Sequence, residues 1–205
     1  MLFFTGMINL IIIGVIVMYL DKFKTRFQEL ECLFLEDKLA YSTKLIPCTE
    51  EEINVIESRL QLSLPDAYKE FLLWGGCWAR GFMEGSYFFF EDLLDLQEAA
   101  IELLKENQFP ESLPSDAFVF FIHQGYYFTF FKTSEGHNPP VYSYLDGQTL
   151  PTFKKEYSSY SDFLIEQLEL SAKCRTSSPL PEGVEEEIYR DKTLAESYPY
   201  LFEEE

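Results

Sequence analysis

Apolar side chains recur at helical spacing just after residue 48. Thr49 and Glu52 form the sequence pattern of a capping box, in which each side chain accepts a hydrogen bond from the backbone N–H of the other. Ile53, Ile56 and Leu60 follow at the spacing of one helix face. This pattern predicts an amphipathic helix that begins at Thr49.

A second helix is predicted directly afterwards. Leu64 and Pro65 precede its first turn, where proline loses no hydrogen bond, and Asp66 favours the positive end of the helix dipole. The predicted buried face carries Tyr68, Phe71 and Leu72. Gly75 and Gly76 end the helix, and we expect them to supply a left-handed conformation at its end.

Beyond residue 76 the pattern favours strands. Residues 86–91 form a short aromatic strand, and residues 117–122 and 126–132 form a hairpin that turns at His123-Gln124-Gly125. A strand over 141–145 ends at the turn signal Asp146-Gly147. Helices are predicted at 93–107 and after Ser159. The sequence therefore predicts an α+β domain over residues 48–172, with N-terminal helices, a central mostly antiparallel sheet and a closing helix.

The N-terminal segment differs from the rest of the chain. Residues 1–20 carry no charged side chain and would span about 30 Å as a helix, the thickness of a bilayer core. Basic residues follow this segment instead of preceding it, which favours an uncleaved membrane anchor with the domain on the cytoplasmic side. A start at Met7 or Met18 and a buried core helix are the alternatives. Residues 21–47 are predicted to be a linker helix.

The net negative charge of the chain indicates which classes of macromolecule it can bind. The 205 residues contain 16 basic and 35 acidic side chains, a formal net charge of −19. Residues 48–170 hold 7 of the basic and 21 of the acidic groups, and residues 173–205 form an acidic tail. Such a chain repels nucleic acid and attracts a basic protein. The candidate protein-binding residues, which follow the Trp78 segment, are Glu84, Glu91, Asp92 and Asp95.

Candidate chemistry is sparse. The sequence contains no phosphate-binding glycine loop, nucleophile elbow or zinc-protease motif. Cys32, Cys48, Cys77 and Cys174 lack the spacing of a zinc knuckle or a redox CxxC motif, and we expect them to be thiols in a reducing compartment. The two histidines, His123 and His137, are well separated in the sequence and make a poor metal site. We therefore expect no catalytic site, no metal and no cofactor.

Several short motifs occur in a fixed order between residues 48 and 170. They are Ile56-Glu57, Leu64-Pro65-x-x-Tyr68-x-x-Phe71-Leu72, Gly75-Gly76, Gly125-Tyr126, Pro140-Val141-Tyr142 and the closing helix that starts with Tyr160-Ser161-Asp162-Phe163-Leu164. In this order they resemble the SUKH superfamily, the Smi/Knr-like domains. The resemblance implies that Leu64, Pro65, Tyr68, Phe71, Gly75 and Gly76 are fold determinants and form no functional site.

The resemblance also implies an α+β domain that binds other proteins and has no enzymatic activity. Bacterial members are similar to immunity proteins that neutralise toxins, often nucleases, and fungal members act as scaffolds in cell-wall signalling. The first hypothesis is therefore an immunity-type module in the cytoplasm, whose acidic surface binds a basic toxin. A scaffold or regulatory protein tethered to the inner face of the plasma membrane is the second hypothesis, and an enzyme of unknown class is the third.

Overall fold

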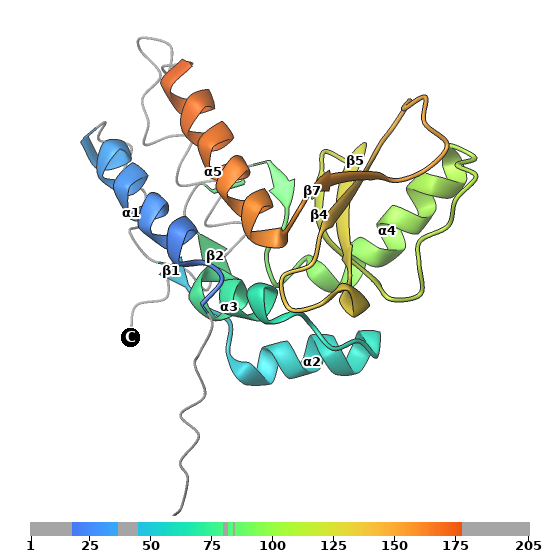
Figure 1. Ribbon diagram of the computed structural model, residues 1–205, viewed down its shortest axis with the longest axis horizontal. Helices are drawn as coiled ribbons and strands as arrows, with labels where there is room; N and C mark the ends of the chain where they lie inside the picture. The colour runs from blue at the N-terminus through green and yellow to red at the C-terminus, as the bar shows by residue number, and fades with distance from the viewer. Residues whose placement is uncertain (1–17, 37–44, 80–81, 84, 178–205) are drawn as a thin grey trace, which may run out of the picture.

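The computed structural model describes residues 18–36, 45–79, 82–83 and 85–177. Five α-helices, seven strands and one short 3-10 helix lie within these residues (Figure 1). In chain order they are α1 (Asp21–Glu36), β1 (Leu45–Ile46), α2 (Glu50–Leu60), α3 (Asp66–Gly75), β2 (Trp78–Ala79), β3 (Ser86–Tyr87), α4 (Leu93–Glu106), β4 (Ala117–His123), β5 (Tyr127–Lys132), η1 (Thr133–Glu135), β6 (Val141–Leu145), β7 (Lys154–Tyr157) and α5 (Tyr160–Ser177).

The main sheet has five strands in the order β3-β4-β5-β6-β7, and every neighbouring pair is antiparallel. The short strands β1 and β2 form a separate antiparallel pair. Helix α4 packs against β4, and Figure 1 shows α5 and α4 on opposite sides of the sheet. The predicted α+β class, with N-terminal helices, an antiparallel sheet and a closing helix, is confirmed.

Most local signals in the sequence correspond to observed geometry. The capping box is present: Thr49 N–H donates to Glu52 Oε2 at 2.7 Å, and Glu52 N–H donates to Thr49 Oγ1 at 3.2 Å. The β4–β5 hairpin turns at Gln124 and Gly125, which have φ angles of 48° and 76°. The loop between the paired residues His123 and Tyr127 has three residues, and the Tyr126 N–H donates to the His123 carbonyl at 3.2 Å. Positive φ at both central residues of such a turn is typical of a type I′ turn. The predicted strand at 86–91 is shorter in the structure, since pairing ends at Tyr87.

Glycines 75 and 76 end α3 for a reason other than the one predicted. Gly76 has φ −70° and ψ −23°, so the expected left-handed conformation is wrong. A Cβ on Gly76 would lie 2.6 Å from the Leu72 Cα and 2.7 Å from the Cys48 Sγ. Close packing therefore requires glycine at this position. The left-handed helix end belongs to α2, where Gln61 has φ 54°.

The ring of Tyr68 lies at the centre of the core between the sheet and α5. Its centroid is 5.2 Å from those of Phe118 and Tyr160 and 5.3 Å from that of Phe131. Phe71, on the same helix, contacts Phe88 at 5.0 Å. All these rings are fully buried. The six positions expected to determine the fold, Leu64, Pro65, Tyr68, Phe71, Gly75 and Gly76, are all buried.

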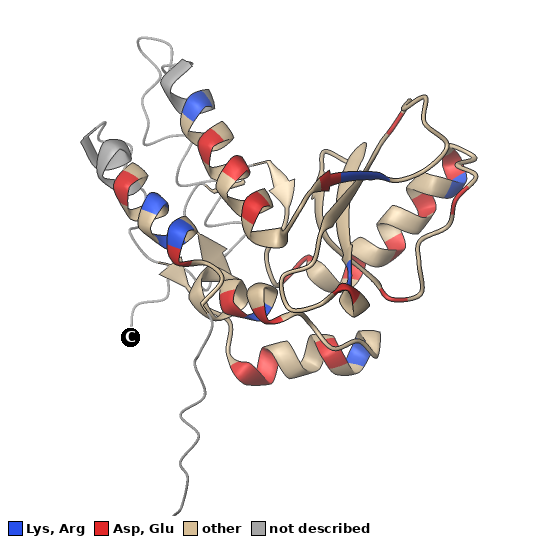
Figure 2. Ribbon diagram, in the orientation of Figure 1, with Lys and Arg blue, Asp and Glu red and all other residues tan. Residues whose placement is uncertain are grey.

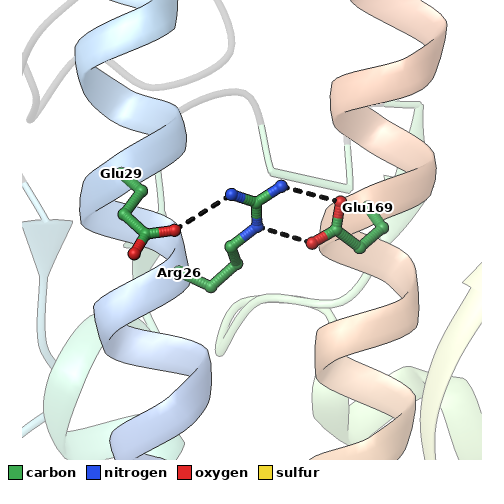
Figure 3. Close-up of polar contacts among 3 residues, drawn as sticks. All are labelled: Arg26, Glu29 and Glu169. Atoms are coloured by element: carbon green, nitrogen blue, oxygen red, sulfur yellow. Dashed lines mark hydrogen bonds and ion pairs between the residues drawn. The ribbon is translucent and has the colours of Figure 1, made fainter.

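Helix α1, predicted as part of a linker, packs against the core. Phe23 and Phe27 are buried and lie 5.2 Å and 4.9 Å from the ring of Trp74. On the outside, Arg26 binds Glu169 of α5 with two hydrogen bonds of 2.6 Å and 3.1 Å (Figure 3). The folded unit therefore includes residues that precede position 48.

Two predicted segments fall largely outside the described residues: the hydrophobic segment, up to residue 17, and the acidic tail, from residue 178. Tyr19 and Leu20, at the end of the hydrophobic segment, pack on the domain. Among the described residues, no helix has the length and apolar character needed to cross a bilayer.

Truncation of a core ring tests the α3 packing. We expect Phe71→Ala to lower the free energy of unfolding by about 3–5 kcal/mol, because the substitution removes a fully buried ring. Urea unfolding monitored by circular dichroism measures the change.

Leu73 on the same helix is the control, since it is 40% exposed. Leu73→Ala should change the free energy by less than about 0.5 kcal/mol. Equal effects of the two substitutions would contradict the assigned buried face of α3.

Candidate protein-binding surface

Helix α4 presents a row of carboxylates to solvent. Its apolar side chains Leu96, Ala100 and Leu104 are buried against the rest of the domain. The acidic residues recur every three or four positions, which places them along one side of the helix. We call this set, all of it exposed, the acidic α4 face: Glu91, which lies just before the helix, and Asp95, Glu98, Glu102 and Glu106 within it. Figure 2 shows acidic positions along the length of α4.

The acidic α4 face includes two of the four residues predicted as contacts. Glu91 and Asp95 belong to it, whereas Glu84 lies outside the described residues. Asp92 is half-buried and accepts a hydrogen bond of 3.1 Å from the Phe88 N–H. Burial raises the pKa of Asp92, although backbone hydrogen bonds act in the opposite direction. Asp92 therefore holds the loop that enters α4.

Sequence reasoning missed Glu98, Glu102 and Glu106. The signal was available, because these residues continue the spacing of Glu91 and Asp95 through a helix that was predicted at 93–107. The sequence prediction rests on proximity to Trp78 along the chain and applies helical periodicity to the apolar positions alone.

The negative charge of the acidic α4 face is not compensated within the described part of the chain. Ion pairs there join other carboxylates to basic groups, such as Glu70 to Lys24 and Glu57 to Lys69. None of them involves the five residues of the face, and α4 itself contains a single basic residue, Lys105. Among the described residues, the charges of these five carboxylates are therefore not offset by an ion pair.

Two cysteines that are distant in sequence lie together beside the start of α2. Cys48 Sγ and Cys77 Sγ are 3.3 Å apart, and Cys77 Sγ is 4.0 Å from the Glu52 carboxylate. The three ligand atoms lie within 4.8 Å of one another, so they could contact one soft divalent cation. The spacing of the cysteines in the sequence gave no indication of this donor set, because the fold alone brings residues 48 and 77 together.

Carboxylates at the start of α2 and just before α4 affect the pKa of the Cys77 thiol. The negative charges of Glu52 and Glu91 each act to raise its pKa, but the hydrogen bond with Cys48 has the larger effect and lowers it. Of the acidic α4 face, Glu91 therefore lies within electrostatic range of the Cys77 thiol.

A comparison with protein-family models places the middle of the chain in a known family. Residues 47–166 match the model of the SMI1 / KNR4 family (SUKH-1), which is more than half of the chain. The chain belongs to this SUKH-1 family. The match begins directly after β1 and runs from α2 to the first turns of α5, so it includes the main sheet and α4. The predicted superfamily is thus confirmed. No curated protein matches the chain.

Membership of the SUKH-1 family is consistent with a protein-binding module of the immunity type. The family match does not single out the acidic α4 face, which rests on the geometry of this chain.

Alanine substitutions of the two glycines at the end of α3 should have different effects on the stability of the SUKH-1 domain. Gly76→Ala should lower the free energy of unfolding by about 1–3 kcal/mol, because the new methyl group would overlap the Leu72 backbone. Thermal or urea unfolding of the purified domain measures this loss.

Gly75→Ala is the matched control. Its Cβ would meet the Ala79 Cβ at 3.4 Å, an ordinary contact, and Gly75 lies within α3. We expect no loss of stability and a gain of up to about 1 kcal/mol from helix propensity. A larger loss for Gly75→Ala than for Gly76→Ala would contradict the close approach of Cys48 and α3.

Proposed function

We propose that this chain is a non-catalytic binding module of the immunity type, and that its acidic α4 face binds a basic protein toxin. The observation that carries the proposal is the row of five exposed carboxylates without ion-pair partners among the described residues. Family membership supports the general class, since SUKH-1 domains are consistent with protein binding. Binding alone would neutralise the toxin.

The spacing of the acidic α4 face suits a partner that normally binds phosphates. The 14 residues of α4 extend over about 21 Å, with successive carboxylates about one helical turn apart. A nuclease holds its nucleic-acid substrate with rows of Lys and Arg side chains. A row of carboxylates competes for the same side chains, so we propose a nuclease as the partner.

Electrostatics would act mainly on the rate of encounter. Opposite charges steer two proteins together and raise the association rate constant, whereas the dissociation rate depends more on close contacts. The Debye length falls from about 10 Å at 0.1 M salt toward about 3 Å at 1 M salt. Association through the acidic α4 face should therefore slow as salt rises.

A double substitution that removes two negative charges tests the role of the acidic α4 face. We expect Glu98→Gln/Glu102→Gln to slow association with the partner by about 3–10-fold at low salt and to make the salt dependence shallower. The partner is first recovered from the native cell with the full chain as bait. Stopped-flow or surface-based kinetics between about 0.05 M and 0.5 M salt then give the rate constants.

Asp162→Asn/Glu166→Gln is the matched control, because it removes the same charge from two exposed residues with the same spacing on α5. This variant should retain the association rate within about twofold. Equal slowing by both variants would assign the effect to net charge and overturn the role of the α4 face. Circular dichroism confirms that both variants fold.

The immunity role has its own test. Expression of the recovered partner alone should stop growth, and co-expression with this chain should restore it. A partner that is harmless when expressed alone would overturn the immunity role while leaving protein binding intact.

A membrane-tethered regulatory module is a second candidate, favoured by the uncharged residues 1–20. We expect the full chain to sediment with membranes, because that length of apolar sequence matches a bilayer core. We also expect the domain to resist protease added outside intact wall-less cells, since positive charges follow the segment. Immunoblots of fractionated cells measure both properties.

A chain that starts at Met18 is the control. It should stay soluble and folded, because the described core begins at Leu20. Full-length protein found entirely in the soluble fraction would overturn the tether.

A further inference from the structure

Cys48 and Cys77 form a contact that the proposed binding function does not involve. Their Sγ atoms are 3.3 Å apart although the residues are separated by 29 positions in the sequence. Cys48 is buried and Cys77 is half-buried, so Cys77 is the more exposed residue of the pair.

The backbone holds both cysteines in place. Cys77 N–H donates to the Ile46 carbonyl at 3.0 Å, and Cys48 N–H donates to the Leu72 carbonyl at 2.8 Å. The pairing of Ile46 with Trp78 continues the same antiparallel arrangement. Gly76 leaves the space that the Cys48 sulfur occupies, since a Cβ there would lie 2.7 Å from that sulfur. The thiols therefore face each other in a fixed frame.

We propose that Cys48 and Cys77 are a redox modification site, which closes to a reversible disulfide when the domain meets a small disulfide such as oxidised glutathione. A disulfide has an S–S distance of about 2.05 Å, so the sulfurs need to approach by about 1.3 Å. Rotation of the two side chains can supply a movement of this size without unpairing β1 and β2.

The two cysteines have different roles in the reaction. The Cys77 thiolate attacks one sulfur of oxidised glutathione, forms a mixed disulfide and releases one glutathione thiolate. Cys48 then loses its proton, and its sulfur attacks the Cys77 sulfur, which releases the second glutathione thiolate. The protein loses two protons and two electrons, and the oxidised glutathione takes them up to become two glutathione molecules.

Exposure and charge support this order. Cys77 is the more exposed residue, and the hydrogen bond that joins the thiols lowers its pKa, which favours the thiolate. The same hydrogen bond and burial raise the pKa of Cys48, so this residue keeps its proton until the mixed disulfide forms. Cys77 is thus the attacking residue and Cys48 the resolving one.

The geometry favours a disulfide over a zinc site. Tetrahedral zinc with Zn–S bonds of about 2.3 Å separates two sulfurs by about 3.7 Å, more than the distance found here. The third donor, Glu52 Oε2, already accepts the Thr49 N–H at 2.7 Å in the capping box. The sulfurs are placed for a bond to each other.

Peptide mapping of the full chain is the direct experiment. The reduced protein is treated with oxidised glutathione, alkylated, digested and analysed by mass spectrometry. We expect a cross-linked peptide that joins Cys48 to Cys77, and its loss on addition of dithiothreitol. Closure of this loop should also raise the thermal midpoint by roughly 5–15 °C. Absence of the cross-link in protein whose Cys77 remains open to alkylation would overturn the proposal.

Variants separate this pair from the other cysteines. Cys32→Ser/Cys174→Ser should form the cross-link as the wild type does, whereas Cys48→Ser should stop at one glutathione bound to Cys77. Cys77→Ser should form neither the cross-link nor the mixed disulfide with glutathione. If a variant at residue 48 fails to fold, the map of the wild-type protein still decides the result. A Cys48 that pairs with Cys32 or Cys174 in that map would also overturn the proposal.

Discussion

The structure depends on the burial of both faces of the two central strands. Nearly every residue of β4 and β5 is buried, so helices must cover the sheet on each side. On one side, Tyr68 joins α3 and α5 to the strands through the rings of Phe118, Phe131 and Tyr160. On the other side, α4 uses its apolar residues for the same purpose. One face of α4 is consequently left to solvent, and the acidic residues lie there.

Much of the fold could be predicted because its signals are local. The capping box, the hairpin at Gln124-Gly125 and the helix after Ser159 each depend on a few adjacent residues. Strand β7 was not predicted, since Lys154, Lys155 and Glu156 have no apolar alternation and pair only at the sheet edge. Strands β1 and β2 have two residues each, too few to show any period. Their pairing depends on tertiary contacts.

The candidate site was predictable in part for a related reason. Abundant carboxylates give no indication of which ones serve the fold and which remain available. Glu57 accepts the Leu64 N–H at 2.7 Å and pairs with Lys69 at 2.6 Å, so it joins α2 to the start of α3. Asp92 has a similar role in its loop. The partners of these carboxylates are set by the fold, as is the approach of Cys48 to Cys77.

The entry of the chain into the domain has a mechanical consequence. Tyr19 N–H donates to Glu70 Oε2 at 2.8 Å, Leu20 has no exposed surface, and α1 begins at the next residue. Lys24 binds the same carboxylate at 2.7 Å. Residues 19 and 20 are therefore fixed to the domain by a hydrogen bond and by burial. A force applied to the chain before residue 19 would therefore be transmitted to α3 through Glu70. An attachment of those residues would also restrict the orientation of the domain.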